Sequence, residues 1–173
     1  MKKFESIIDD KIKNKISENC EKMNKNSEQI FKGDYKDSDI KINEIKKNEL
    51  GFIDLCAGTG GFHTALDNIE EYNTKCILAS DIDKNCRKVY FINHGIPVHN
   101  DLKDIEYKNI KNIDIVCAGF PCQPFSVAGK RLGLDDARGT VIHNILEIVK
   151  TNKPKMIVLE NVKGLKSMKN KDK

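Results

Sequence analysis

Short apolar runs recur along the chain from Leu50 onward, and each ends in glycine, proline or a polar residue. Runs of this length, rich in isoleucine, leucine and valine, are typical of strands buried on both faces. We expect five strands, at residues 51–55, 76–80, 96–99, 113–118 and 155–160. The segments between them have helical spacing at residues 62–69, 84–94 and 140–149.

The predicted helices carry recognisable start and stop signals. Asp83 and Thr140 can cap helix N-termini, Gly95 is suited to ending the second helix, and Pro154 follows the third. Strands that alternate with helices indicate a parallel sheet. The predicted fold class is therefore α/β, a Rossmann-like sheet of about five parallel strands with an N-terminal helical extension.

The first 49 residues differ from the rest. Phe4, Ile8, Ile12 and Ile16 form a narrow apolar stripe at helical spacing, and residues 33–49 are polar and irregular. We expect a charged helical extension and linker at 1–49 and a catalytic domain at 50–173. A helix-turn-helix regulator in the first segment is the less favoured alternative.

Charge is unevenly distributed over the 173 residues, whose net charge is +4. Residues 1–49 carry +1, residues 50–162 carry −1 and residues 163–173 carry +4. A DNA-binding protein normally presents a basic surface, because neutralising phosphates supplies much of the affinity. The segments that hold DNA most strongly are therefore expected outside the central region.

The six cysteines include no C-x-x-C pair, and no Cys/His group has the spacing of a zinc site. No metal site is predicted. The chain has no apolar run of about 18 residues and no signal-peptide pattern at its start. We therefore expect a soluble, cytoplasmic protein with reduced thiols and no membrane contact.

Polar residues follow each predicted strand. Asp54 and the loop Gly58-Thr59-Gly60-Gly61 close the first strand, and Asp81 follows the second. Asp101, Cys122 and Glu160 follow the next three. Parallel strands bring their carboxyl ends to one edge of a sheet, where open α/β folds bind ligands.

The glycine loop and Asp81 suit a nucleoside ligand. Asp81 lies 21 residues beyond Gly60, a spacing that fits a carboxylate bound to ribose hydroxyls. A nicotinamide or flavin cofactor is disfavoured, because His63 replaces the third fingerprint glycine and Asp54 would repel a pyrophosphate. S-adenosylmethionine, a cationic nucleoside without phosphate, fits better.

Cys122 lies between Pro121 and Pro124, after a predicted strand. Proline fixes its own φ and biases the residue before it away from helix. The thiol is therefore expected on a stiff turn at a strand end, where nucleophiles are displayed. The alternative is a buried, inert cysteine.

Four sequence blocks together resemble the successive motifs of the DNA cytosine-5 methyltransferases. They are residues 52–62 (FIDLCAGTGGF), 119–126 (GFPCQPFS), 136–140 (DARGT) and 160–162 (ENV). Their order and spacing also match, and the resemblance covers about residues 51–166. It implies the methyltransferase fold, S-adenosylmethionine as cofactor and double-stranded DNA as substrate, with a restriction enzyme as a possible genetic companion.

The resemblance also implies a role for each motif residue. Cys122 would attack C6 of a flipped-out cytosine, Glu160 would hold the N3 edge of the base, and Arg138 would support the site. Asp81 would bind the ribose, Asp101 the adenine amino group, and Ile82 and Leu102 the faces of the adenine. The remaining cofactor residues would be Phe52, Asp54, Cys56, Gly58, Gly60, Gly61 and Pro121. A loop from Gln123 to Leu134 would close over DNA, with Gln123, Ser126 and Lys130 as contacts.

Two departures from the family pattern are visible. Cys56 stands where many members carry a phenylalanine that stacks on the adenine. The chain also ends at Lys173, before the Gln-Arg-Arg motif and the target-recognition region of the family. We therefore expect residues 1–173 alone to be inactive and to need a complementing chain.

Two alternatives remain open. The chain could be an inactive remnant or a regulatory module that only binds the cofactor. A transfer-RNA methyltransferase is less favoured, because that branch tends to carry Pro-Pro-Cys whereas this chain has Phe120-Pro121-Cys122.

Overall fold

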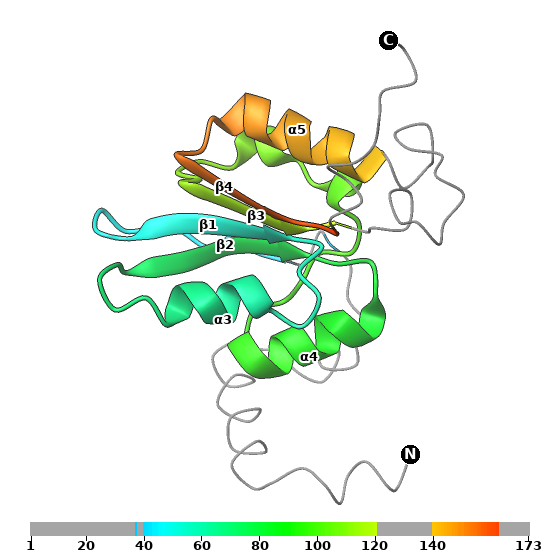
Figure 1. Cartoon of the computed structure of the whole chain (residues 1–173), viewed down its shortest axis with the longest axis horizontal. Coiled ribbons are helices and arrows are strands. Elements are labelled where there is room, and N and C mark those ends of the chain that lie inside the picture. Colours follow the sequence, from blue (N-terminus) through cyan, green and yellow to red (C-terminus); the bar gives the residue numbers. More distant parts are fainter. Residues whose placement is uncertain (1–36, 38–39, 121–139, 163–173) are drawn as a thin grey trace, which may run out of the picture.

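The computed structural model describes residues 37, 40–120 and 140–162 (Figure 1). The helix predicted within residues 1–32 lies outside this part of the chain, as do Cys122, Arg138 and the predicted DNA loop. The described region corresponds to the predicted catalytic domain and the end of the linker before it.

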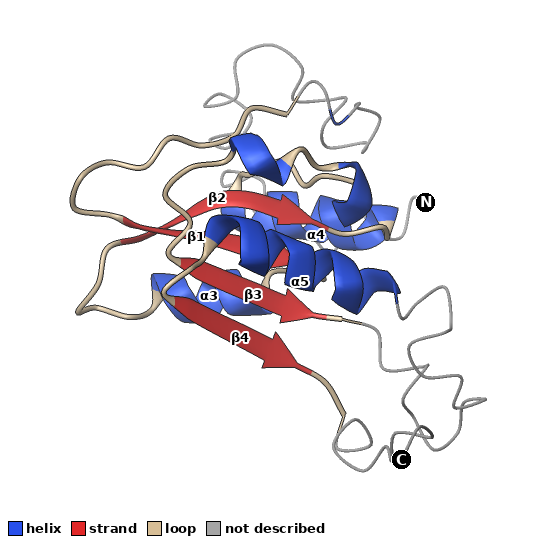
Figure 2. Cartoon of the chain, turned by 90° about the horizontal axis from the view of Figure 1, so that it is seen from above, coloured by secondary structure: helices blue, strands red, loops and turns tan. Residues whose placement is uncertain are grey.

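A four-stranded parallel sheet forms the centre of the described region. Its strands are β1 (Leu50–Leu55), β2 (Thr74–Ser80), β3 (Ile115–Gly119) and β4 (Met156–Glu160). They are arranged in the order β2-β1-β3-β4 (Figure 2). Each of them overlaps a strand predicted from an apolar run, so the parallel α/β class is confirmed.

Helices cover both faces of the sheet (Figure 1). Helices α3 (Gly61–Asp67) and α4 (Lys84–His94) lie on one face. Helix α5 (Thr140–Asn152) lies on the other, together with the short 3-10 helices η2 (Leu102–Asp104) and η3 (Tyr107–Asn109). The result is a three-layer arrangement.

The alternation of side chains along β1 and β3 divides the core in two. Ile53, Leu55 and Val116 pack towards α5, where Ile145 and Ile148 are fully buried. Phe52 and Cys117 pack towards α4, against Tyr90. Both faces of the central strands are therefore dry, as the continuous apolar runs predicted.

The prediction of a strand at 96–99 is wrong. Only a single bridge forms there, between His99 and Ser80. Pro97 has no amide hydrogen to donate, which limits how far a ladder can extend through this segment. The described sheet consequently has four strands rather than five, but the bridge still brings the next segment to the edge of the sheet.

The predicted helix caps on α4 are confirmed. The Asp83 carboxylate accepts hydrogen bonds from the backbone amides of Asn85 and Cys86. Gly95 ends the helix with φ of 69°, a left-handed conformation that glycine adopts without strain. These two residues fix where the helix begins and ends.

Strand β4 is an edge of the described sheet (Figure 2). Three of its apolar side chains are partly exposed. Met156 is 54% exposed, and Ile157 and Leu159 are each 45% exposed. Within the described part of the chain, the outer side of this strand therefore combines exposed apolar side chains with backbone groups that pair with no other strand. Among the described residues, no helix is both long and apolar enough to cross a membrane.

Candidate cofactor and active site

The carboxyl ends of the four strands meet at one edge because the strands are parallel. The first two ends are tied directly, since the Ala57 amide donates to the Ser80 carbonyl at 3.0 Å. The segment after His99 joins them through the Asp81 amide, which donates to the His99 carbonyl at 2.9 Å. Three of the predicted site segments are therefore held together by backbone hydrogen bonds.

Asp81 holds the glycine loop. One carboxylate oxygen accepts from the Gly58 amide at 2.8 Å, and the other accepts from the Asp83 amide at 2.8 Å. Gly58 and Gly60 have φ of 55° and 94°, which favour glycine. The 21-residue spacing noted in the sequence thus corresponds to direct contact between acid and loop.

Ile82 follows Asp81 directly in the sequence, and Asp101 lies close enough to Cys56 for its charge to act on the thiol. Ile82 is 72% exposed, which is unusual for an isoleucine next to a buried strand. The Asp101 carboxylate caps η2 by accepting from the Lys103 amide at 3.1 Å, and it pairs with the Lys103 ammonium at 3.0 Å. The site therefore offers one open apolar surface between carboxylates.

Arg87 is a positioning residue that sequence reasoning missed. Its guanidinium donates to the carbonyls of Asp81 and Ile82 at 2.8 and 2.9 Å, and to the Asn100 side chain at 3.1 Å. The residue is only 9% exposed. Arg87 thus joins the segments that carry Asp81 and Asp101. The sequence offers one hint of this role, because Arg87 lies one helical turn after Asp83, the N-cap of α4.

Three predicted cofactor residues lie deeper than the resemblance implied. Phe52 and Asp54 are fully buried, and Leu102 is 5% exposed within the core beneath α5. Phe52 packs edge-on against His63, with ring centroids 5.1 Å apart. These side chains therefore pack in the core beneath the site, and they present little surface to a ligand.

Burial raises the pKa of Asp54 from 3.8 to about 7. The His63 amide and the Tyr90 hydroxyl partly offset this rise, whereas the charge of Asp81 adds to it. Neither oxygen of the Asp54 carboxyl group accepts a well-formed hydrogen bond. The fold therefore favours the protonated acid directly beneath the glycine loop.

Cys56 occupies the turn after β1 with φ of 52°. Burial raises the pKa of its thiol to about 12, and the neighbouring carboxylates of Asp81, Asp54 and Asp101 add to the rise. The thiol is therefore neutral near pH 7 and cannot act as a nucleophile there. The resemblance placed Cys56 among the cofactor residues, and a neutral thiol suits such packing, but this role stays a prediction.

The ends of β3 and β4 are joined at the predicted active site. The Asn161 side chain donates to the Phe120 carbonyl at 3.0 Å, one residue before Pro121. Glu160 is paired in register with Gly119, and its Oε2 lies 3.7 Å from the position that a Cβ on Gly119 would occupy. Asn161 therefore fixes the backbone from which the Pro-Cys segment departs.

The remaining predicted site residues lie outside the described part of the chain. They are Pro121, Cys122, Gln123, Ser126, Lys130 and Arg138. Gly61, by contrast, is the first residue of α3. The described residues thus contain the cofactor half of the predicted site and the Glu160 side of the catalytic half.

A separate pocket of about 540 Å³ lies at the opposite edge of the sheet. Leu50, Asn73, Asp114 and Lys155 line it, all at or just before the amino ends of strands. None of the predicted site residues reaches it. It has no part in the site at the carboxyl edge.

Comparison with known sequences identifies a family. Residues 50–173 match the family model described as C-5 cytosine-specific DNA methylase. The type II methyltransferase M.HhaI of Haemophilus parahaemolyticus is 42% identical over 131 residues, which are 76% of this chain and 39% of that protein. M.HpaII of Haemophilus parainfluenzae is 45% identical over 123 residues, covering 70% and 34% of the two chains.

Solved structures give the same result for the fold. The Entamoeba histolytica methyltransferase EhMeth superimposes with a TM-score of 0.60 at 26% identity, covering 69% of this chain and 40% of the other. The S. pombe Dnmt2 methyltransferase gives 0.55 at 30% identity, covering 69% and 38%. The chain thus spans roughly two-fifths or less of the proteins that it matches here.

Proposed function

Because this chain belongs to the C-5 cytosine-specific DNA methylase family, we propose that it carries the cofactor-binding and catalytic part of an enzyme that methylates C5 of cytosine in double-stranded DNA. The methyl donor is S-adenosylmethionine. The similarity to type II methyltransferases favours a role in restriction-modification.

One observation gives the strongest support for S-adenosylmethionine as the cofactor. The carboxylate of Asp81 is bound to the Gly58 amide at 2.8 Å, beside the exposed side chain of Ile82. A ribose would meet the carboxylate and an adenine would cover the isoleucine, whose exposure is otherwise unfavourable. The acidic surroundings also suit a ligand with a sulfonium and an ammonium group.

The chain's own residues would act on the base. The Cys122 thiolate would add to C6 and make C5 nucleophilic. After C5 has gained the methyl group, loss of its proton to a base would restore the C5–C6 double bond and expel the thiolate. Glu160 would hold the N3 edge of the same ring and offset the charge that develops there. Bound S-adenosylmethionine supplies the methyl group. Asn161 would position the backbone before Pro121, because it holds the Phe120 carbonyl.

A complete enzyme would need residues beyond these. The chain spans only 39% and 34% of M.HhaI and M.HpaII, and the apolar edge of β4 is uncovered among the described residues. We propose that the region which recognises the DNA sequence belongs to further polypeptide. This polypeptide would pack against β4 and cover its apolar edge. The same coverage favours a second candidate, a cofactor-binding module without activity.

A covalent trap tests the proposed function. DNA containing 5-fluorocytosine, S-adenosylmethionine and the complementing region of a relative such as M.HpaII are incubated with this chain. The fluorine cannot leave as a proton does, so the Cys122 adduct should persist and migrate as a protein–DNA species on a denaturing gel. Cys122→Ala should abolish this species, and Cys86→Ala, which changes a half-buried free cysteine on α4, should not. An adduct that survives Cys122→Ala would remove this residue from the mechanism.

A further inference from the structure

The predicted linker before β1 reaches the edge of the sheet where the cofactor is expected. Asp37 lies 63 residues before Asn100 in the sequence, yet both oxygens of its carboxylate accept from the Asn100 amide at 3.1 Å. Asn100 directly precedes Asp101, which the resemblance assigns to the adenine amino group. Asp37 itself belongs to none of the sequence motifs. A residue far from the motifs therefore contacts the segment that carries one of the predicted cofactor residues.

The direction of the Asn100 amide explains this contact. The His99 carbonyl accepts from the Asp81 amide at 2.9 Å, so it points towards the end of β2. The carbonyl and the amide of one trans peptide unit point in opposite directions, and the Asn100 amide therefore points away from β2. Because β2 is an edge of the described sheet, the acceptor there is the Asp37 carboxylate and no described strand. The His99 Nδ1 atom lies 3.9 Å from the same carboxylate, which is beyond hydrogen-bond length.

Contacts further along the linker set the approach of Asp37. The Asn43 amide donates to the Ile77 carbonyl at 3.1 Å, and the Asn43 side chain donates to the Cys76 carbonyl at 2.9 Å. Both carbonyls belong to β2, where its pairing with β1 is irregular. Ile45 packs against the core cluster beneath α5. The linker is thus tied to β2 before it joins β1, and Asp37 meets the segment that bridges to the end of β2.

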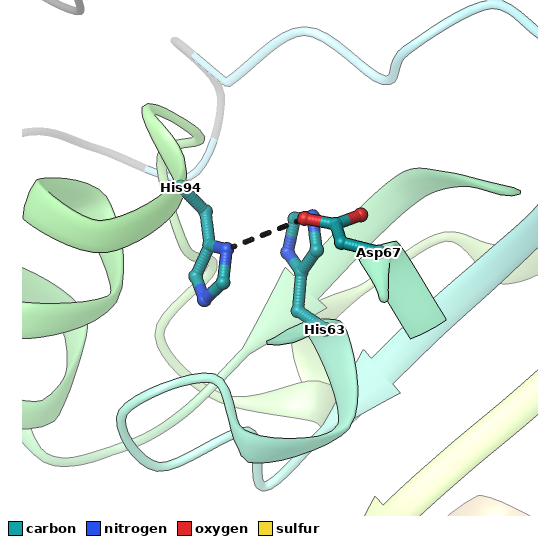
Figure 3. Close-up of side chains that lie close together, drawn as sticks. All are labelled: His63, Asp67 and His94. Atoms are coloured by element: carbon teal, nitrogen blue, oxygen red, sulfur yellow. Dashed lines mark ion pairs between the residues drawn. The ribbon is translucent and has the colours of Figure 1, made fainter. Parts of the chain in front are cut away.

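Asn100 is also held by its side chain. The Arg87 guanidinium on α4 donates to the Asn100 side-chain oxygen at 3.1 Å. Helix α4 is in turn packed against α3, because the ring of His94 stacks on that of His63 with centroids 3.9 Å apart and planes at 9° (Figure 3). The linker therefore holds the backbone of Asn100, and a separately anchored helix holds its side chain.

We propose that Asp37 is a positioning residue for the adenine of the cofactor. By holding the Asn100 amide, it fixes the backbone from which the Asp101 carboxylate reaches the adenine amino group. The Asp101 carboxylate also accepts from the Lys103 amide at 3.1 Å and pairs with the Lys103 ammonium at 3.0 Å. A displaced turn would leave Asp101 to Lys103 and weaken its contact with the adenine. This inference rests on the proposed function, because it requires S-adenosylmethionine at this edge of the sheet.

Two ligands that differ at the adenine amino group test this proposal by calorimetry on the 173-residue chain. S-adenosylhomocysteine carries the amino group, S-inosylhomocysteine carries an oxygen in its place, and the wild type should prefer the first. Asp37→Ala should weaken the binding of S-adenosylhomocysteine about two- to tenfold and leave that of S-inosylhomocysteine unchanged. Asp37→Asn keeps an acceptor oxygen and should retain most of the preference. Glu44→Ala, which removes the same charge from an exposed position of the same linker, should bind like the wild type.

The ratio of the two affinities separates positioning from a loss of structure. A variant that is partly unfolded binds both ligands more weakly by the same factor, so its ratio equals that of the wild type. An unchanged ratio in Asp37→Ala would therefore overturn the inference, while binding by the wild type would still support the proposed function. If the wild type binds neither ligand, the proposed function fails, and the inference fails with it.

Discussion

Asp54 shows how strongly burial can change the pKa of a single side chain. It lies near the end of β1, before Leu55, where an acid could equally line a cofactor pocket or close a turn. The structure buries it completely, beside Tyr90 and His63. Sequence reasoning identified the position but not this depth, because α3 and α4 supply the atoms that cover it.

Asp54→Asn should therefore stabilise the protein in a pH-dependent way. The pKa of the acid is 3.8 when unfolded and about 7 when folded, so folding favours the protonated form. The stability that the protonated acid provides is complete below pH 3.8 and is lost as the pH rises through 7. At pH 7.5 the variant should gain up to about 4 kcal/mol in the free energy of unfolding, and at pH 4 almost nothing.

Urea denaturation at pH 4 and pH 7.5 measures this difference. His63, whose pKa is lowered to about 4 by burial, changes the stability in the opposite direction. Both proteins contain it, so its effect cancels in the comparison. Asp104→Asn, which alters an exposed acid on η2, serves as the control. A gain that does not vary with pH would show that folding does not raise the pKa of Asp54.

Among the elements, α4 was predicted most closely. Its boundaries at Lys84 and His94 match those expected, because Asp83 and Gly95 give local signals that need no tertiary contact. The strand expected at 96–99 failed for the opposite reason. Val98 is buried and Ile96 is half-buried, yet the pairing of this segment depends on neighbours that the local sequence does not specify.

Removing the cap on α4 should cost stability. Asp83→Ala deprives the amides of Asn85 and Cys86 of their acceptor, and such a loss typically costs about 1 kcal/mol. Asp83→Ser keeps an acceptor oxygen and should retain most of the stability. Thermal unfolding of the two variants beside the wild type measures the difference. Equal Tm values for alanine and serine would show that the cap contributes nothing.

Strand β4 should make the chain associate with itself. An apolar edge with unpaired backbone groups is a template for pairing, and Ile157 is 45% exposed there. Analytical ultracentrifugation should show association that grows with concentration. Ile157→Lys should reduce it, because a lysine on an edge strand opposes pairing, while Val89→Lys, at an exposed position on α4, should not. A monomeric wild type at all concentrations would contradict this account.

At the scale of the whole molecule, the class of fold and the family could be predicted from four motifs and the alternation of strands and helices. The structure adds what binds the motifs together, above all Asp81 on the glycine loop and Asn161 on the Phe120 carbonyl. Arg87 escaped prediction, because it acts mainly on the backbone carbonyls of Asp81 and Ile82, and no sequence motif marks such contacts. The catalytic half of the site around Cys122 stays a prediction.

The central claim is that the carboxyl edge of this sheet binds S-adenosylmethionine, and calorimetry on the 173-residue chain tests it most directly. Wild type should bind the cofactor. Ile82→Ser should bind about tenfold more weakly, since an adenine face would lose about 1.4 kcal/mol of apolar contact. Ile69→Ser, which removes a partly exposed isoleucine after α3, should bind like the wild type. The absence of binding to wild type, or an affinity that Ile82→Ser leaves unchanged, would contradict the account.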